Sequence, residues 1–256
     1  MTEATRPTPG APCWVSLLVH GVDASKKFYG ALFGWEFAPG PDSLGPYVRA
    51  LIDGKEVAGI GRRPIGRRLP VAWTTYMATE NADATAEAIR SACGTVGVGP
   101  LDAGDAGRLI IGSDPGGAIF GVWQPRAYQG TAKYGTHGTP TWNALLTSRT
   151  SAVSKFYQAV FGYDAEVSDA GLDQVTLRLD GRPVAGLHGV GQDLSPDRGS
   201  YWMTFFEVED TDETTRRVVE LGGQVVRPPR ERARGRLATV ADPEGAVFTI
   251  VRSADR

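Results

Sequence analysis

Glu207 is the side chain whose type and position best suit proton transfer. Side chains alternate between the two faces of a strand, so Glu207 is predicted to share a face with Met203 and Phe205. Burial beside apolar side chains raises the pKa of a carboxyl group, which is what a general base needs near neutral pH. The alternative is that Glu207 lies so close to the end of its strand that water solvates it.

The chain has three histidines and two cysteines, which limits metal and thiol chemistry. His20, His137 and His188 are expected at a strand end, in a linker and in a loop, exposed to solvent rather than sharing a metal. Cys13 and Cys93 are too few for a disulfide framework or a thiolate zinc cluster. No serine lies in a nucleophile-elbow pattern, so a Ser-His-Asp mechanism has no support.

Aromatic residues and methionine recur at alternate positions of the predicted strands. Such side chains on one face of a sheet could line a cleft for a planar apolar ligand. The alternative is that they fill the interior as core. The candidate ligand-binding residues of this kind are Trp14, Tyr76, Trp123, Trp142, Met203 and Phe205.

Two arginines at matching positions are further candidates for ligand binding. Arg108 and Arg236 each follow a glycine, and each could hold an anionic or carbonyl group at the mouth of a cleft. The alternative is that they form ion pairs with the nearby Asp114 and Asp242.

Composition is typical of a soluble globular protein, with 41% hydrophobic and 22% charged residues. The formal net charge of −2 gives no attraction to nucleic acid. Two basic runs, 62–68 and 227–234, lack interleaved aromatic residues and are expected in solvated loops. No apolar run approaches the ~20 residues of a membrane span, and no signal-peptide pattern begins the chain. We therefore predict a cytoplasmic protein that binds neither nucleic acid nor membrane.

The elements that position these candidates occur twice in the chain. Trp14 and Trp142 lie 128 residues apart, and so do Phe28 and Phe156. The match continues toward the end of the chain with small changes of offset, since Gly54 matches Gly181 and Trp73 matches Trp202. The sequence therefore predicts two tandem domains, 11–126 and 140–253, joined by a linker at 127–139 that contains three glycines.

Each copy is predicted to be α+β. Gly34 is expected to end the first helix, and Asp53-Gly54 is expected to form a turn between two strands. Helices with one apolar face are expected at 24–33, 82–92, 151–161 and 212–221. Strands of the first copy are expected at 14–19, 47–52, 56–60, 73–78, 95–98, 108–111 and 118–123. This alternation alone is compatible with several α+β folds.

Two motifs, each present twice, show a resemblance to a known superfamily. The first is Phe-Tyr-x-x-x-Phe-Gly, beginning at Phe28 and Phe156, and the second is Asp-Pro-x-Gly-Ala-x-Phe, beginning at Asp114 and Asp242. Over nearly its whole length the chain resembles the vicinal oxygen chelate superfamily of glyoxalase I, bleomycin-resistance proteins and extradiol dioxygenases. It is similar to two-domain bacterial members, some of which are labelled hydroxylases. The resemblance implies two glyoxalase-like domains, each of two βαβββ units whose strands form a U-shaped open sheet.

The resemblance also implies where a metal site would lie. Metal-using members carry a His or Gln on the first strand, a His or Glu on the fifth and a Glu on the eighth. None of the residues at these positions is a good ligand for a divalent cation, although a threonine hydroxyl can bind weakly. We therefore expect no metal and no other cofactor. The residues concerned are Trp14, Thr74 and Gly121 in the first copy, and Trp142, Met203 and Thr249 in the second.

Two main functions from different classes remain open, beside a third, a stress or regulatory protein with degenerate pockets. The first is binding or sequestration of a small aromatic or apolar ligand, most simply an aromatic natural product, as bleomycin-resistance proteins do. The alternative is an enzyme of the same superfamily, a glyoxalase-like lyase or isomerase, or an oxygenase or hydroxylase, acting on a natural product or an aldehyde. The first copy has Ala78 where the second has Glu207, so the two clefts are expected to differ in function. The chain is expected to be a monomer or a homodimer.

Overall fold

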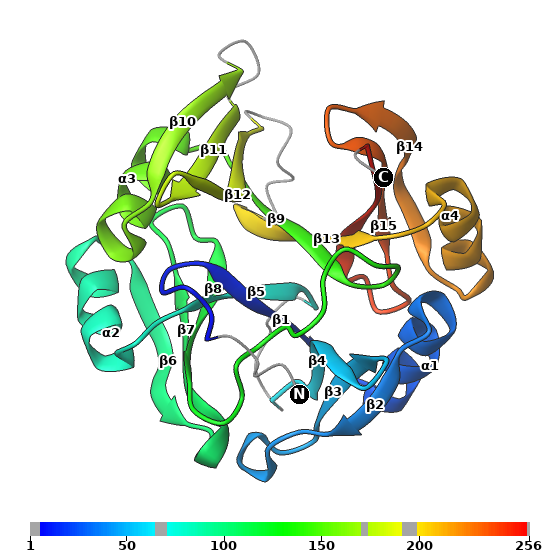
Figure 1. The fold of residues 1–256 in the computed structure, drawn as a ribbon, viewed down its shortest axis with the longest axis horizontal. Coiled ribbons are helices and arrows are strands. Elements are labelled where there is room, and N and C mark those ends of the chain that lie inside the picture. The colour runs from blue at the N-terminus through cyan, green and yellow to red at the C-terminus, as the bar shows by residue number, and fades with distance from the viewer. Residues whose placement is uncertain (1–5, 65–70, 170–173, 191–198, 255–256) are drawn as a thin grey trace. The chain divides into compact units, whose positions relative to one another are not determined.

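The computed structural model describes residues 6–64, 71–169, 174–190 and 199–254. Within these residues the elements form four successive modules, each with the predicted order βαβββ (Figure 1). Module 1 comprises β1 (Pro12–Val19), α1 (Val22–Phe33), β2 (Glu36–Pro39), a 3-10 turn (Asp42–Leu44), β3 (Tyr47–Ile52) and β4 (Lys55–Arg62). Module 2 comprises β5 (Trp73–Ala78), α2 (Ala82–Ser91), β6 (Thr95–Asp102), a 3-10 turn (Gly104–Ala106), β7 (Gly107–Ser113) and β8 (Ile119–Pro125).

The second copy repeats this order. Module 3 comprises β9 (Pro140–Thr147), α3 (Thr150–Phe161), β10 (Asp164–Asp169), β11 (Gln174–Leu179) and β12 (Arg182–Gly189). Module 4 comprises β13 (Tyr201–Glu207), α4 (Thr211–Glu220), β14 (Gln224–Arg232), β15 (Gly235–Ala241) and β16 (Val247–Ser253).

All strands of one copy belong to one eight-stranded mixed sheet. The order is β2-β3-β4-β1-β5-β8-β7-β6 in the first copy and β10-β11-β12-β9-β13-β16-β15-β14 in the second. The first and last strands of each module pair in parallel, whereas the other pairs within a module are antiparallel. These sheets confirm the predicted α+β class and the tandem duplication.

The chain forms two compact units, and each unit combines modules from different copies. Unit 1 comprises Met1–Trp14, Thr74–Gly130 and Trp142–Met203, which contain most of modules 2 and 3. Unit 2 comprises Val15–Trp73, Thr131–Thr141 and Thr204–Arg256, which contain most of modules 1 and 4. The domain boundaries expected from the sequence follow the copies instead, and they stay a prediction.

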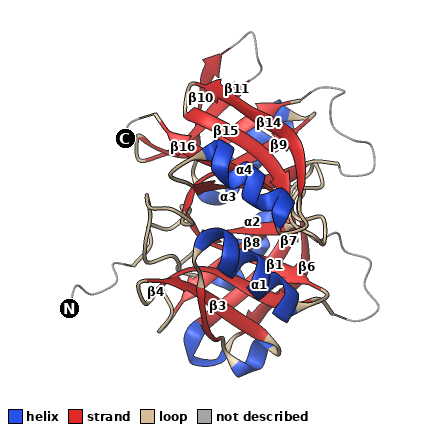
Figure 2. Cartoon of the chain, turned by 90° about the vertical axis from the view of Figure 1, so that its right-hand side faces the viewer, coloured by secondary structure: helices blue, strands red, loops and turns tan. Residues whose placement is uncertain are grey.

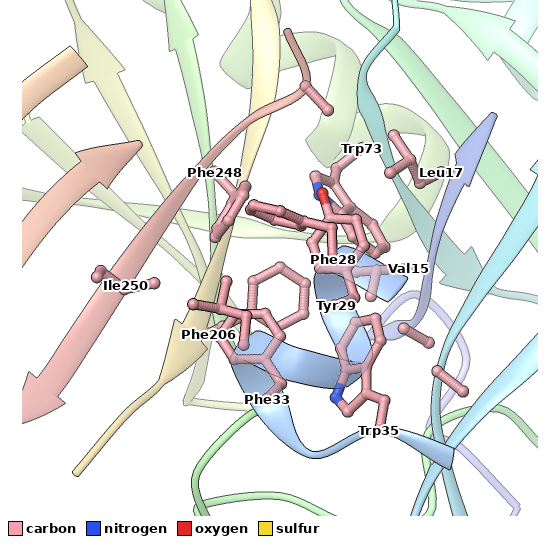
Figure 3. Packing of buried hydrophobic residues seen from close by; sticks show 14 of the residues in the cluster. Val15, Leu17, Phe28, Tyr29, Phe33, Trp35, Trp73, Phe206, Phe248 and Ile250 are labelled. Carbon is pink, nitrogen blue, oxygen red and sulfur yellow. The ribbon is translucent and has the colours of Figure 1, made fainter. Parts of the chain in front are cut away.

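Each unit has its own hydrophobic core. In unit 2 the core is rich in aromatic rings (Figure 3). The ring of Phe206 lies 5.2 Å from that of Phe33 and 5.1 Å from that of Trp73, centroid to centroid. Burial of one such side chain contributes roughly 1.5–3 kcal/mol. Helix α4 joins this core through Val218 and lies against β14, β15 and β16 (Figure 2).

The two repeated motifs meet inside these cores. In unit 2 the Tyr29 hydroxyl donates to Asp242 at 3.0 Å and accepts from Trp73 Nε1 at 3.2 Å. The other oxygen of Asp242 accepts two backbone N–H groups of its own turn. The motif tyrosine of one copy thus binds the motif aspartate of the other. Burial raises the pKa of the aspartate in both units. The equivalent residues of unit 1 are Tyr157, Asp114 and Trp202.

Local signals determine several element boundaries. Gly34 ends α1 in the left-handed conformation with φ 71°, as predicted. Asp53 and Gly54 form the predicted turn with φ values of 51° and 69°. Asn81 caps α2 by accepting from the backbone N–H of Ala84 at 3.0 Å.

One expectation about the basic runs is wrong. The second run was expected in a loop, but most of it forms the edge strand β14. Its two prolines lie between Arg227 and Arg230, where the register with β15 shifts and a ladder hydrogen bond is not needed. The first run falls largely on residues 65–70, which lie outside the described residues.

Cys13 is buried and Cys93 is exposed, and both are free thiols, so the fold holds no disulfide. In the described ranges, no helix is long and apolar enough to cross a membrane.

Candidate functional site

Module 2 presents two rows of side chains on the face of its strands that points away from α2, called here the far face of module 2. Helix α2 packs on the other face, against β6, β7 and β8 (Figure 1). Cross-strand partners in register share a face of a sheet. The predicted residues Tyr76 and Trp123 therefore lie on one face, on neighbouring strands. One row runs Tyr76, Gly121, Ile111, Val98, and the next runs Ala78, Trp123, Leu109, Leu101.

The ring of Tyr76 lies directly on Gly121. A Cβ atom at Gly121 would stand 2.2 Å from Cδ1 and 2.4 Å from Cε1 of that ring. Real Cβ atoms essentially never approach so closely, so the ring occupies the space that any side chain at position 121 would need. Tyr76 is half-buried, and part of it is therefore accessible to solvent.

Tyr128 joins two predicted tryptophans into an aromatic cluster in unit 1. Its ring centroid lies 5.1 Å from that of Trp14 and 6.0 Å from that of Trp123, both edge to face. Trp123 Nε1 also donates to the backbone oxygen of Tyr128 at 2.9 Å. The sequence did not single out Tyr128, because it follows β8 in the expected linker. The one feature of the sequence that could have indicated a role for Tyr128 is that an aromatic residue stands two positions before Gly130 in the expected linker.

The positions expected for metal ligands do not fit a divalent cation. In unit 1, Trp14 and Gly121 occupy two of the three positions of the first copy, and the Tyr76 ring fills the space over Gly121. Thr74, the third, offers only a hydroxyl. Across the part of the chain that the structure describes, no group of three His, Cys, Asp or Glu side chains could hold a metal.

Trp142 and His188 approach the same glycine in module 3. A Cβ atom at Gly186 would stand 3.2 Å from Trp142 Nε1 and 3.0 Å from His188 Nε2. His188 was expected in an exposed loop, but it lies half-buried on β12, because this strand extends to Gly189. Met203 is buried on β13.

Glu207 is buried in unit 2, where Ser253 holds its carboxylate. The Ser253 backbone N–H donates to one oxygen at 3.0 Å, and its hydroxyl donates to the other at 2.6 Å. The side chain is 1% exposed, so the alternative of a solvated strand end is wrong. The backbone of Glu207 also exchanges hydrogen bonds with Gly138 and Thr139, which directly precede β9, so this end of β13 is paired rather than open to water. Phe205 is also buried and pairs in register with Thr249.

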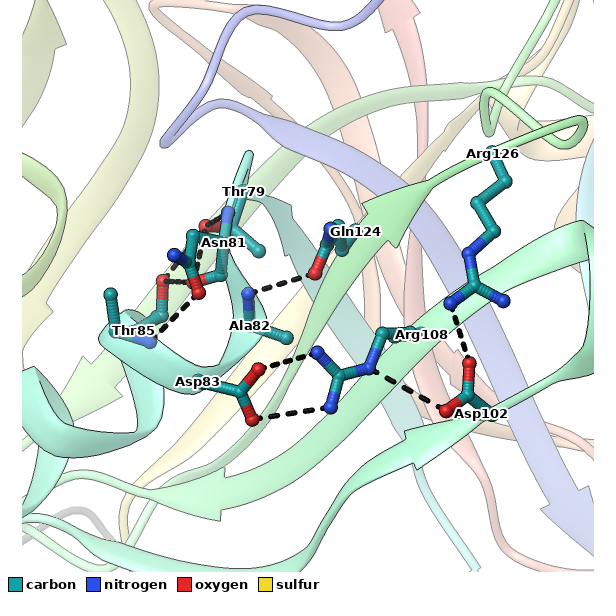
Figure 4. A network of polar contacts seen from close by, with 10 residues as sticks. Thr79, Asn81, Ala82, Asp83, Thr85, Asp102, Arg108, Gln124 and Arg126 are labelled. Carbon is teal, nitrogen blue, oxygen red and sulfur yellow. Dashed lines mark hydrogen bonds and ion pairs between the residues drawn. The ribbon is translucent and has the colours of Figure 1, made fainter.

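Arg108 forms a polar network with helix α2 and strand β6 (Figure 4). It donates to both oxygens of Asp83, at 2.6 and 3.1 Å, and lies 3.8 Å from Asp102. Arg126 also pairs with Asp102, at 2.7 Å. The hydrogen bond from Arg108 lowers the pKa of Asp83. Carboxylates of its own module therefore already hold this guanidinium.

Arg236 repeats this arrangement in module 4. It donates to both oxygens of Asp212, at 2.5 and 2.8 Å. The predicted pairing of the two arginines with Asp114 and Asp242 is wrong. Those aspartates are buried with the core tyrosines, while each arginine faces the first turn of a helix.

The remaining histidines have ordinary partners in unit 2. His20 is exposed, as predicted, and its Nε2 lies 2.8 Å from Arg63. His137 is half-buried rather than exposed, because its ring contacts the Leu32 carbonyl oxygen at 3.2 Å and the edge of Phe33.

Comparisons with known proteins agree on one family. The model of the glyoxalase-like domain matches residues 144–251, and that of the bleomycin resistance protein-like N-terminal region matches residues 13–48. The anthracycline biosynthesis protein DnrV of Streptomyces peucetius is 37% identical over 264 residues, covering 96% of this chain and 94% of that protein. CFP32 of Mycobacterium tuberculosis, whose name refers to a glyoxylase, is 34% identical over 252 residues, covering 96% and 95%. The chain belongs to the glyoxalase and bleomycin-resistance family.

Solved structures of the vicinal oxygen chelate superfamily share the fold of this family member. The Mn(II)-bound glyoxalase from Novosphingobium aromaticivorans has a TM-score of 0.67 and 15% identity, covering 97% of this chain and 85% of that one. The 2,2',3-trihydroxybiphenyl 1,2-dioxygenase of Sphingomonas wittichii has a TM-score of 0.64 and 13% identity, covering 96% and 91%. At these identities the likeness concerns the fold alone. The function must therefore be argued from this chain's own residues.

Proposed function

We propose that this chain binds an aromatic natural product on the far face of module 2, without a metal. The observation that carries the proposal is the ring of Tyr76 lying on Gly121. Metal-using members are expected to have a glutamate at that position, whereas this chain presents an aromatic surface there. A half-buried phenol ring offers a planar ligand a stacking surface.

The neighbouring side chains of the far face support an apolar ligand. Leu109 and Trp123 lie in the row beside Tyr76. At the outer strand β6, Val98 and Leu101 are 37% and 45% exposed. Exposed apolar side chains beside buried aromatic rings are typical of a surface that a ligand covers. A relative named for anthracycline biosynthesis supports the same class, because an anthracycline contains a planar polycyclic aromatic system.

The contacts of Glu207 favour binding over acid–base catalysis. Both of its oxygens accept hydrogen bonds from Ser253. The first copy replaces both partners with apolar residues, Ala78 and Pro125, at the matching positions. Because the carboxylate and its hydrogen-bond partner are both present in one copy and both absent from the other, we infer that the pair stabilises the fold.

The test uses 1,8-dihydroxyanthraquinone as a planar aromatic probe of the intact chain. Tryptophan quenching and calorimetry should show saturable binding that Tyr76→Ala weakens about tenfold, the equivalent of ~1.4 kcal/mol of lost stacking. Gly121→Ala should weaken binding as well, because its methyl group displaces the Tyr76 ring. The matched control is Tyr134→Ala, which removes a 57% exposed tyrosine of unit 2 and should leave affinity unchanged.

Two outcomes would overturn the proposal. One is calorimetric binding of Mn²⁺, Fe²⁺, Zn²⁺ or Ni²⁺ tighter than ~100 μM, since the donor set described above should not reach that affinity. The other is consumption of an aromatic compound that stops with Glu207→Gln while binding persists, which would identify an enzyme with Glu207 as its base.

A further inference from the structure

Module 4 has two rows of cross-strand partners at the same positions as module 2, but the side chains in them are of different types. The face considered is again the one that points away from the module's own helix, called here the far face of module 4. Where module 2 has aromatic and aliphatic side chains, module 4 has hydroxyls, a carboxylate and arginines. One row runs Phe205, Thr249, Thr239, Arg227, and the next runs Glu207, Val251, Leu237, Arg230.

Register shifts in β14 place its arginines on a single face. Arg227 and Arg230 are three residues apart, so a regular strand would place them on opposite faces. A shift of register between them instead sets Arg227 opposite Thr239 and Arg230 opposite Leu237. Arg232 follows opposite Gly235 on the same face. The edge strand therefore presents three cationic side chains to the far face.

These arginines lack the carboxylate partners that hold Arg236. Arg236 lies on the helix side, where Asp212 and Glu231 pair with it. Among the described residues, neither Arg227 nor Arg230 has an ion pair, and the Nε atom of Arg230 is buried without a hydrogen-bond partner. Burial lowers the pKa of Arg230, and repulsion from Arg232 and Arg227 lowers it further. An anion placed there would stabilise the charged guanidinium and offset its repulsion by the other two arginines.

The geometry points to a second ligand site on the far face of module 4, one that binds a small organic anion. Arg227 and Arg230 would hold its carboxylate or phosphate oxygens through charge-assisted hydrogen bonds. The hydroxyls of Thr239 and Thr249, 3.5 Å apart, lie in the same row as Arg227. Phe205, at the end of that row, would contact the apolar part of the ligand.

The first copy shows that the fold does not require these arginines. Val98 and Leu101 occupy the matching positions of β6, opposite Ile111 and Leu109. The register of β6 shifts at the same two places as that of β14. An edge strand with this geometry thus accommodates aliphatic residues. The fold therefore does not explain why module 4 has arginines there, whereas binding of an anion would.

The experiment compares a carboxylate with its neutral isostere on the intact chain. Naphthalene-2-carboxylate, 2-naphthamide and inorganic phosphate are titrated separately by calorimetry. The wild-type chain should bind the carboxylate roughly tenfold or more tightly than the amide, because only the carboxylate pairs with the arginines. Binding of phosphate alone would show that the oxyanion suffices, whereas binding of the naphthoate alone would show that the apolar part is also needed.

The variant Arg230→Leu, which installs the first-copy residue, should lose most of the preference for the carboxylate. Its matched control is Arg216→Leu, which makes the same charge change at an exposed α4 arginine paired with Glu213. Equal effects of the two variants, equal affinity for carboxylate and amide, or no anion binding up to ~1 mM would overturn the proposal. This site stands apart from the proposed function, because Arg230→Leu should not change anthraquinone binding and Tyr76→Ala should not change the carboxylate preference.

Discussion

Thr75 and Thr204 occupy the same position in the two copies but differ in their hydrogen bonding. In unit 1 the hydroxyl of Thr75 donates to Asn143 Oδ1 at 2.9 Å, and both residues are buried. The residue that matches Asn143 in the first copy is Val15. Consistently, the buried hydroxyl of Thr204 finds no partner within the described part of unit 2. Both copies thus carry the threonine of this polar pair, but only the second copy carries the asparagine.

Replacing each threonine with valine should therefore give opposite results. Thr75→Val removes the donor from the buried Asn143 and should lower the free energy of unfolding by about 1–3 kcal/mol. Thr204→Val replaces an unsatisfied buried hydroxyl with a methyl group and should leave stability unchanged or raise it. Equilibrium urea unfolding of both variants measures the difference. Equal losses would show that the Thr204 hydroxyl has a partner after all.

At the scale of elements, Cys93 ends the turn after α2 in a conformation that suits glycine. Its φ is 65°, whereas its counterpart after α4 is Gly222, with φ 87°. A side chain in this left-handed region is strained, so Cys93→Gly should stabilise the chain by about 1 kcal/mol. Gly222→Ala should destabilise it by a similar amount, since the nearest atom to the new Cβ is 3.9 Å away and no clash contributes. Thermal unfolding of both variants tests the pair, and a loss of stability in Cys93→Gly would contradict it.

The elements that sequence reasoning predicted well are those set by local signals. Gly34 ends its helix as expected because its conformation is nearly independent of the rest of the chain. Strand β14 was missed because Pro228 and Pro229 normally exclude a strand, and only the register shift opposite β15 makes room for them. Such a shift depends on how β14 pairs with β15, and the sequence of β14 alone does not show that pairing.

In the candidate site, too, features set by local patterns were predicted, whereas features set by contacts between distant residues were not. Period-two alternation put Tyr76 on the same face as Thr74, and Trp123 on the same face as Gly121. The structure adds the register of β5 and β8, which sets Tyr76 opposite Gly121 and so brings Tyr76 and Trp123 to one face. Tyr128 was missed because its contacts with two tryptophans depend on the path of the chain after β8. The partner of Arg108 was predicted wrongly because Asp83 is near in space but distant in sequence.

At the scale of the whole molecule, both cores are built from residues of both copies. The core of unit 2 takes Phe28 and Phe33 from the first copy and Phe206 and Phe248 from the second. The tyrosine and aspartate motifs are likewise satisfied only between copies. Each copy therefore contributes part of both cores rather than one complete core. Each sheet, in contrast, is formed by the strands of a single copy.

The two copies should consequently fail to fold as separate monomers. A fragment of residues 1–139 would expose the core faces of α1 and α2, and a fragment of residues 140–256 would expose those of α3 and α4. Each fragment alone should give either a weakly structured monomer or a homodimer, because a second copy can supply the missing halves. Mixed fragments should regain the near-ultraviolet circular dichroism and the cooperative unfolding of the intact chain. Analytical ultracentrifugation of each fragment decides the matter. A monomeric fragment with its own cooperative transition would show that one copy holds a sufficient core, as the domain boundaries at 11–126 and 140–253 would require.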